Sequence, residues 1–369
     1  MKSKLLFLLL LLGSSYITAQ TVIENPPFET RQGSIHTISK IELSPTETRL
    51  TIRTVFRPQW WTSLDSLTYI YAPESKKQLY PLRIEGRKFG EQVTTPASGI
   101  IEDDCVITYP PLPEGTTRID WIDDNLNSET NTYGILLVKP QETKEQASLR
   151  KIHGNWQQAD AQNGWDIGIY DSLAIMDNRF WKYDLCRKQG KKFKLNLKDE
   201  TGEQCLLEIT QEKDGNLCIG KNGGKANKYI RAGRPQRNYA ATTAATAPQT
   251  AFFRKDTVHI RGFLDGYSPK LGFTTVLIYT DNHITNEGTP AVVTIHPDGR
   301  FESDFVVNYP GVHHLSMGNN WMTFYIRPGE TLMLYINWED HLDYLRQRRL
   351  KPMLTETLYM GPSSSINQE

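Results

Sequence analysis

The sequence has no excess of charge of either sign. Lys and Arg together number 42, Asp and Glu together also number 42, and the formal net charge is +0. A protein that binds nucleic acid through its phosphates needs a basic surface, so this balance argues against a nucleic-acid partner. Long apolar runs are missing as well. The run at residues 5–12 falls well short of the ~20 residues that a transmembrane helix needs, so we expect no membrane span.

Cysteine is scarce, and its spacing excludes one kind of redox site. No two cysteines are separated by two residues, so the Cys-x-x-Cys dithiol of thioredoxin-like enzymes is absent. The four positions are Cys105, Cys186, Cys205 and Cys218.

Other catalytic motifs are missing too. There is no Gly-x-Ser-x-Gly elbow for a serine nucleophile. The glycine-rich residues 222–225 lack the length and the Lys-Ser/Thr ending of a phosphate-binding loop. His313 and His314 are adjacent on a predicted strand, so they point to opposite faces and cannot share a metal ion. The remaining histidines are scattered, among them His153, His259, His283 and His341.

These absences favour a chain without catalytic activity, cofactor or metal. Paired carboxylates for hydrolysis stay open, because two carboxylates can meet in the fold from any distance in sequence.

The amino terminus has the layout of a secretory signal peptide. Lys2 and Lys4 precede the apolar run, and small residues follow up to Ala19. This pattern predicts cleavage after residues 1–19 and a soluble protein exported to the periplasm or the cell exterior.

The rest of the chain is typical of turn-rich β proteins, with 26 glycines, 20 prolines and 10% aromatic residues. Residues 20–140 are predicted to form an antiparallel β-sandwich, with Leu50, Ile52 and Phe56 on one face of a strand. Two acidic groups, 102–104 and 123–124, lack calcium-loop spacing, and we interpret them as solvated loop charges.

A second β-module is predicted for residues 151–232, after a polar linker or short helix at 141–150. Its short strands with regular turns favour a small lipocalin-like barrel or a meander. Two interpretations of its aromatic residues stay open. Either they ring a cavity for an apolar or sugar ligand, or they fill the interior of a small barrel. The residues concerned are Trp156, Trp165, Phe180 and Trp181.

One predicted turn in this module bears on disulfide formation. If residues 213–215 form the turn, Leu217 falls on the face of Leu207, and Cys218 points away from Cys205. A Cys186–Cys218 disulfide stays open in an exported protein, as does the alternative of buried thiols.

The third module is expected at residues 251–338, after a flexible linker at 233–250 that is rich in Ala and Thr. Alternating strands and a Pro-Asp-Gly turn at 297–299 predict a compact antiparallel sandwich. Residues 339–369 are predicted to hold a short helix and an unstructured tail.

Several short segments resemble the amino-terminal β-modules of exported TlpA-type thiol-disulfide oxidoreductases from Bacteroidota. In that family a thioredoxin domain with its dithiol follows these modules, and no such dithiol occurs here, so the resemblance carries over no catalytic residue. The similar segments are 25–29, 38–43, 56–58 with Trp60 and Trp61, 109–115, 180–183, 298–301, 326–330 and 359–361.

We therefore hypothesise a non-catalytic exported protein of three β-modules that binds or positions a protein partner, related to a thiol-disulfide oxidoreductase without its catalytic domain. The alternatives are a carrier of a small apolar or sugar ligand in the central barrel, or a fragment of a thiol-disulfide reductase.

Overall fold

The computed structural model divides the chain into two compact units, Met1–Lys139 and Pro140–Glu369. The predicted signal peptide and nearly all of the predicted linker at 233–250 lie outside the described residues. The structure describes residues 21–123, 131–138, 143–160, 164–233, 253–282, 285, 287–318, 320–346 and 357–368.

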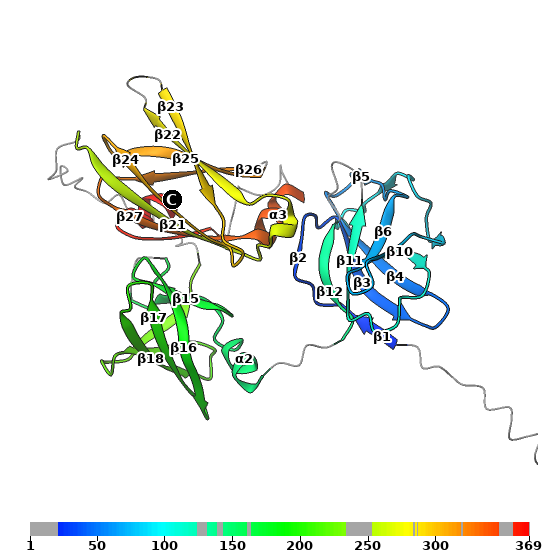
Figure 1. Cartoon of the computed structure of the whole chain (residues 1–369), viewed down its shortest axis with the longest axis horizontal. Coiled ribbons are helices and arrows are strands. Elements are labelled where there is room, and N and C mark those ends of the chain that lie inside the picture. Colours follow the sequence, from blue (N-terminus) through cyan, green and yellow to red (C-terminus); the bar gives the residue numbers. More distant parts are fainter. Residues whose placement is uncertain are drawn as a thin grey trace, which may run out of the picture. The chain divides into compact units, whose positions relative to one another are not determined.

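The first unit is a sandwich of two five-stranded antiparallel sheets (Figure 1). Leu50 and Ile52 are fully buried and pack with Trp121 of the opposite sheet, which confirms their predicted core face. Phe56 lies just beyond its strand and is only half-buried. One sheet consists of β1 (Thr21–Glu24), β3 (His36–Leu43), β4 (Thr48–Val55), β10 (Ile100–Tyr109) and β8 (Arg83–Glu85), in that order. The other consists of β2 (Thr30–Arg31), β12 (Thr132–Leu136), β11 (Arg118–Asp123), β6 (Thr68–Ala72) and β7 (Lys77–Leu79). A separate pair joins β5 (Trp61–Thr62) to β9 (Val93–Thr94).

The second unit begins with helix α2 (Lys144–Leu149), whose first turn is closed by a capping box between Thr143 and Gln146. Leu149 and Ile152 then pack into the core of a closed eight-stranded barrel, so the barrel alternative is the one observed. Trp156 pairs with Arg231 where the first and last strands close it. The strands are β13 (Gly154–Gln158), β14 (Ile167–Ile169), β15 (Leu173–Met176), β16 (Arg179–Gln189), β17 (Lys192–Asp199), β18 (Gln204–Gln211), β19 (Leu217–Lys221) and β20 (Asn227–Arg231).

A second sandwich follows the barrel in the same unit (Figure 1). The predicted turn is present: Gly299 has φ +85° and donates its N–H to the His296 carbonyl at 2.8 Å. One sheet consists of β24 (Arg300–Val307), β21 (Asp256–Asp265), β27 (Thr331–Asn337) and β28 (Leu358–Met360), and the other of β23 (Glu287–Thr294), β22 (Thr275–Asn282), β25 (Gly311–Met317) and β26 (Asn320–Ile326). The short helices are η1 (Pro269–Leu271), α3 (Trp338–Arg346) and α4 (Ser364–Gln368).

Two predictions about this sandwich were wrong. It is not wholly antiparallel, because β21 and β27 pair in parallel from His259↔Thr331 to Asp265↔Asn337. Strand periodicity predicts which side chains are buried, but it does not predict which distant strands pair. The tail is not unstructured either, since β28 pairs with β27 and α4 follows it.

The barrel and the second sandwich share a hydrophobic cluster. Met333 and Tyr335 face outward from their sheet, because the alternate residues Leu332 and Leu334 lie in the sandwich core. Barrel residues cover this outward side, so the two modules pack against each other. The cluster contains Trp165, Tyr170, Leu173, Ile175, Phe180, Phe263, Met333, Tyr335, Leu358 and Met360.

None of the helices in the described part of the chain is long and apolar enough to cross a membrane.

Candidate binding surface

The four aromatic residues that the sequence placed around a barrel cavity divide into two pairs. Trp156 and Trp181 lie in the barrel core. The indole N–H of Trp156 donates to the Ile152 carbonyl at 2.9 Å, and that of Trp181 donates to the Met176 carbonyl at 3.1 Å. Both rings therefore have apolar neighbours and a satisfied polar atom, as buried tryptophans need.

Trp165 and Phe180 lie instead in the cluster between the barrel and the sandwich. The Trp165 ring centroid is 5.9 Å from that of Tyr335, and the Arg300 guanidinium lies 5.5 Å from the Phe180 ring centroid. The four side chains do not ring one shared space, because two fill the barrel and two attach it to the sandwich. A ligand role for them stays a prediction.

Three of the four thiols have a raised pKa, which makes them poor nucleophiles. No disulfide joins any two of the four cysteines, all of which lie in described strands. Burial raises the pKa of Cys105 to about 12 and also raises the pKa of Cys205. The hydrogen bond from Cys218 to the Glu212 carboxylate, at 3.2 Å, raises the pKa of that thiol. Reactive cysteines need the opposite shift, since the thiolate is the nucleophile.

The positions of the cysteines in the barrel also show which pairs could form a disulfide. Leu207 and Leu217 are buried while Cys218 lies on the other face, which confirms that it points away from Cys205. The Cys186–Cys218 disulfide is not formed: these residues lie on β16 and β19, and two strands separate them in the barrel.

His313 and His314 lie on opposite faces of their strand, as their adjacency in the sequence predicted. His313 is buried, with its ring centroid 5.9 Å from those of Phe305 and Phe324, whereas His314 lies on the opposite face of the strand. No cluster of three His, Cys, Asp or Glu suited to a metal occurs among the described residues. His283 lies outside them.

The acidic residues at 102–104 are not loop charges, so that interpretation was wrong. All three lie in β10, where a register irregularity separates Ile101 from Cys105. The exposed Glu102 pairs with Arg53 at 2.8 Å. The carboxylate of Asp104 is buried, and it lies 3.1 Å from the equally buried Arg87 guanidinium. Of the second group, Asp123 is buried and Asp124 lies outside the described residues.

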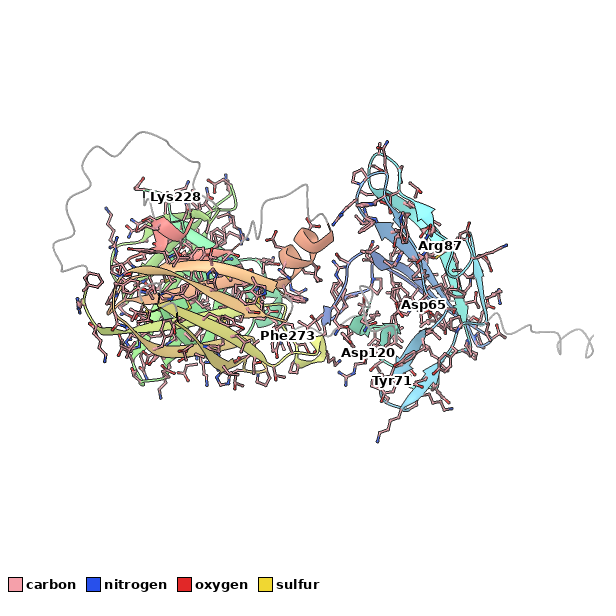
Figure 2. The ribbon with its side chains drawn as sticks, turned by 90° about the horizontal axis from the view of Figure 1, so that it is seen from above. Asp65, Tyr71, Arg87, Asp120, Lys228 and Phe273 are labelled. Carbon is pink, nitrogen blue, oxygen red and sulfur yellow. The ribbon has the colours of Figure 1, made fainter. Side chains whose placement is uncertain are left out.

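The buried ion pair belongs to a polar network inside the first sandwich, where Figure 2 labels Arg87. The Thr54 hydroxyl donates to Asp104 at 2.6 Å and lies 2.9 Å from His36 Nδ1. Burial, followed by the charge of Arg87, lowers the pKa of His36 to about 3. The network therefore holds a neutral histidine beside a buried ion pair, a structural arrangement that the sequence did not signal.

A cavity of about 190 Å³ opens between the sheets of the same sandwich. At its wall the Arg31 guanidinium lies 5.0 Å from the Phe28 ring centroid. A volume of this size holds a few water molecules or one small molecule. It is lined by Asn25, Pro26, Phe28, Arg31, Thr37, Ile38, Thr132 and Ile135.

Two neighbouring tryptophans form the most prominent exposed aromatic site on this sandwich. Trp60 is 37% exposed and Trp61 is 54% exposed. The Arg57 guanidinium lies 4.7 Å from the Trp60 ring centroid and 5.8 Å from that of Phe56. We call Arg57, Trp60 and Trp61 the tryptophan site.

Backbone bonds fix the loop that carries the tryptophan site. The buried Thr95 donates its N–H to the Trp60 carbonyl at 2.9 Å, and its hydroxyl bonds the Arg57 carbonyl. Thr95 also accepts the N–H of Gln59, which has φ +58°, and Trp61 pairs with Thr94 in a short ladder. The exposed rings thus sit on a rigid backbone, which lowers the entropy cost of binding.

Sequence reasoning singled out Trp60 and Trp61 only as part of a resemblance. The sequence does contain a signal for this site, because two adjacent tryptophans in an extended segment cannot both point into one core.

The comparisons with known proteins leave the family open. No family model matches the chain, and no curated protein matches it. A solved structure described as a tetra-tandem repeat in the extending region of a large adhesion protein aligns with 86% of this chain and 76% of that chain. Its sequence identity is 10% and its TM-score is 0.11, a level at which the alignment carries no argument.

Proposed function

We propose that this chain is an exported, non-catalytic binding protein, whose β-modules hold the tryptophan site in position for a protein partner. The observation that carries the proposal is the exposure of Trp60 and Trp61 on a loop that Thr95 fixes. Export is inferred from the amino-terminal sequence pattern.

The chemistry of the tryptophan site supports a protein partner. Tryptophan and arginine are the residue types most enriched among the side chains that dominate binding energy at protein interfaces. Here the guanidinium of Arg57 already stacks on Trp60, so little side-chain freedom remains to be lost on binding.

The non-catalytic part of the proposal is supported by the thiols. Cys105, Cys205 and Cys218 all have a raised pKa, whereas disulfide exchange requires an accessible thiolate. A relationship to TlpA-type oxidoreductases remains our sequence-based hypothesis.

Site-specific photocross-linking in the expressing cell tests the binding surface. A benzophenone side chain in place of Trp61 is expected to give one discrete protein adduct, and Arg57→Ala with Trp60→Ala is expected to abolish it. The matched control places the same group at Leu82, which is 60% exposed on the same sandwich. Equal adducts at both positions, or none at position 61, would reject the surface.

An insulin-reduction assay with the purified full chain tests the absence of catalysis separately. The expected rate equals that of dithiothreitol alone. Sustained turnover above that rate would reject the non-catalytic assignment whatever the cross-linking shows.

A further inference from the structure

The hairpin of β16 and β17, neighbouring strands of the barrel, concentrates positive charge (Figure 1). Residues 185–198 include six basic residues and no acidic one, in a chain whose charges balance overall. All six side chains are exposed. They are Arg187, Lys188, Lys191, Lys192, Lys194 and Lys198.

Strand alternation places most of this charge on the outside of the barrel. Phe193, Leu195 and Leu197 lie in the barrel core, and Cys186 packs against it, so the alternate residues of both strands point outward. We call this outward side, with the adjoining side of β18, the basic face. It consists of Lys182, Leu185, Arg187 and Gln189 on β16, with Asp184 at the register irregularity, Lys192, Lys194, Asn196 and Lys198 on β17, and Gln204, Leu206, Glu208 and Thr210 on β18.

Basic residues lie directly opposite each other on the basic face. Lys182 pairs with Lys198 across the two strands, and Arg187 pairs with Lys194. Like charges in opposed positions destabilise a sheet. Of the basic residues on this face, Lys194 alone has an acidic partner in the described part of the chain, Glu208 at 2.7 Å. The basic face therefore keeps a net positive charge at a cost to folding.

Charges next to the basic face are paired instead. In the turn after β17, Asp199 and Glu203 both pair with Arg179, and Glu200 is exposed. Farther round the barrel, Lys221 pairs with Asp177 at 3.1 Å and Lys228 with Glu212 at 3.0 Å. The positive charge of the basic face is thus left for an anion outside the chain to neutralise.

An exposed leucine lies within the positive charge and indicates which anion. Leu185 is 38% exposed, and its row continues across the strands through Asn196 to the half-buried Leu206. This row lies between the Lys182–Lys198 pair and the Arg187–Lys194 pair. A soluble anion that neutralises the charges leaves Leu185 in water. The surface of a bilayer has anionic headgroups directly above acyl chains, so it accommodates the basic residues and the leucine together.

We propose that the basic face binds the surface of a bilayer that contains anionic lipids. Five of the six basic residues between 185 and 198 are lysines. Their flexible stems and point charges suit a fluid array of phosphates, whereas a fixed anion is more often held by the planar fork of arginine. Lys188 and Lys191, at the tip of the hairpin, extend the contact beyond the face. The proposal is independent of the tryptophan site, which lies in the other unit.

Co-sedimentation of the full chain with lipid vesicles tests the proposal. We expect the chain to bind vesicles of phosphatidylcholine with about 30% phosphatidylglycerol, and not vesicles of phosphatidylcholine alone. Raising the salt concentration should release it, because salt screens exposed charges.

Charge removal at two positions tests whether the basic face makes the contact. Arg187→Gln with Lys192→Gln is expected to weaken binding to the anionic vesicles about twentyfold, since each basic residue near an anionic surface contributes roughly fivefold. The matched control is Lys221→Gln with Lys228→Gln, which makes the same change of charge on the same barrel at residues that already have acidic partners. We expect the control to bind as the wild type does.

Leu185→Ser distinguishes a bilayer from a soluble polyanion, with heparin as the probe of the latter. If Leu185 enters the acyl boundary, this variant should lose severalfold in binding to the anionic vesicles. Its binding to heparin should be unchanged, because the substitution removes no charge. Circular dichroism establishes that each variant is folded.

Equal binding to the two kinds of vesicle, or to neither, would overturn the proposal. So would equal losses in the Arg187/Lys192 variant and in its control, because the contact would then depend on net charge and not on this face. Strong binding to heparin, together with vesicle binding that Leu185→Ser leaves unchanged, would assign the basic face to a soluble polyanion instead.

Discussion

Asp104 brings a negative charge into the first sandwich, at a position that water does not reach. Its side chain is 4% exposed and that of its partner Arg87 is 3% exposed. Removing two charges from water is costly, and their mutual attraction offsets that cost only while both are present. The pair therefore contributes less to stability than the loss of either partner would cost.

The Asp104→Asn variant is accordingly expected to lose about 3–5 kcal/mol of stability in the first sandwich, because Arg87 remains buried without a counter-ion. Hydrogen exchange of peptides from β4 and β10 in the full chain measures the loss. Glu102→Gln is the control on the same strand, since its pair with Arg53 is exposed and is worth about 0–1 kcal/mol. Equal losses in the two variants would contradict the assignment of a buried pair.

At the scale of elements, the edge of β26 shows how the end of the chain completes the second sandwich. Asn367 of α4 accepts the Tyr325 N–H at 2.6 Å and donates to the Tyr325 carbonyl at 2.8 Å. One side-chain amide thus occupies both backbone groups that Tyr325 presents at an open sheet edge. Such edges are otherwise templates for pairing with other chains.

Asn367→Ala removes both hydrogen bonds of the Tyr325 backbone. The free energy that protects the Tyr325 amide from hydrogen exchange is therefore expected to fall by about 1–3 kcal/mol, the usual cost of leaving backbone groups without a partner. Hydrogen exchange followed by NMR measures it directly. Asn367→Asp keeps the acceptor for the N–H and loses the donor, so its loss should be smaller. Ile366→Ala, at an exposed neighbour, serves as the control. Unchanged exchange in Asn367→Ala would contradict the role of this side chain.

The sequence predicted these elements unevenly, for physical reasons. Runs such as 300–307 alternate apolar and polar residues around a Pro-Asp-Gly turn, and both signals are local. Asp104 has no local signal, because its burial depends on the irregular register of β10 against β4. The segment 358–360 is too short for its sequence to predict a strand, and it forms one because it pairs with β27.

The candidate sites were likewise predictable from sequence only where the signal is local. The aromatic content of the barrel was evident from sequence, but the separation of Trp165 and Phe180 from Trp156 and Trp181 depends on contacts with residues near 333–360. Such contacts join segments more than a hundred residues apart, and the periodicity of a single segment does not predict them.

At the scale of the whole molecule, the barrel and the second sandwich are joined by stacked aromatic rings. Tyr335 stacks on Tyr170, with centroids 5.6 Å apart and planes tilted by 10°, and its hydroxyl donates to Asp265 at 2.8 Å. Burial raises the pKa of both tyrosines, so both stay protonated at physiological pH. These contacts predict that the two modules unfold as one cooperative unit.

Tyr335→Ala is expected to cost about 3–5 kcal/mol, the usual consequence of truncating a large buried ring. It should also separate the joint transition of the two modules into two. Differential scanning calorimetry of the full chain detects the change. Tyr335→Phe keeps the ring and should preserve the joint transition with a smaller loss. If Tyr335→Ala leaves one transition, the stacked rings do not couple the modules.

The parallel pairing of β21 with β27 has a consequence for synthesis of the chain. His259 emerges from the ribosome about seventy residues before its partner Thr331, an interval of roughly 4–14 s at ordinary translation rates. During that time β21 has only β24 to pair with, and its other edge stays open. An open strand edge is a template for pairing with other chains, so the nascent sandwich is exposed to such pairing until β27 has been synthesised.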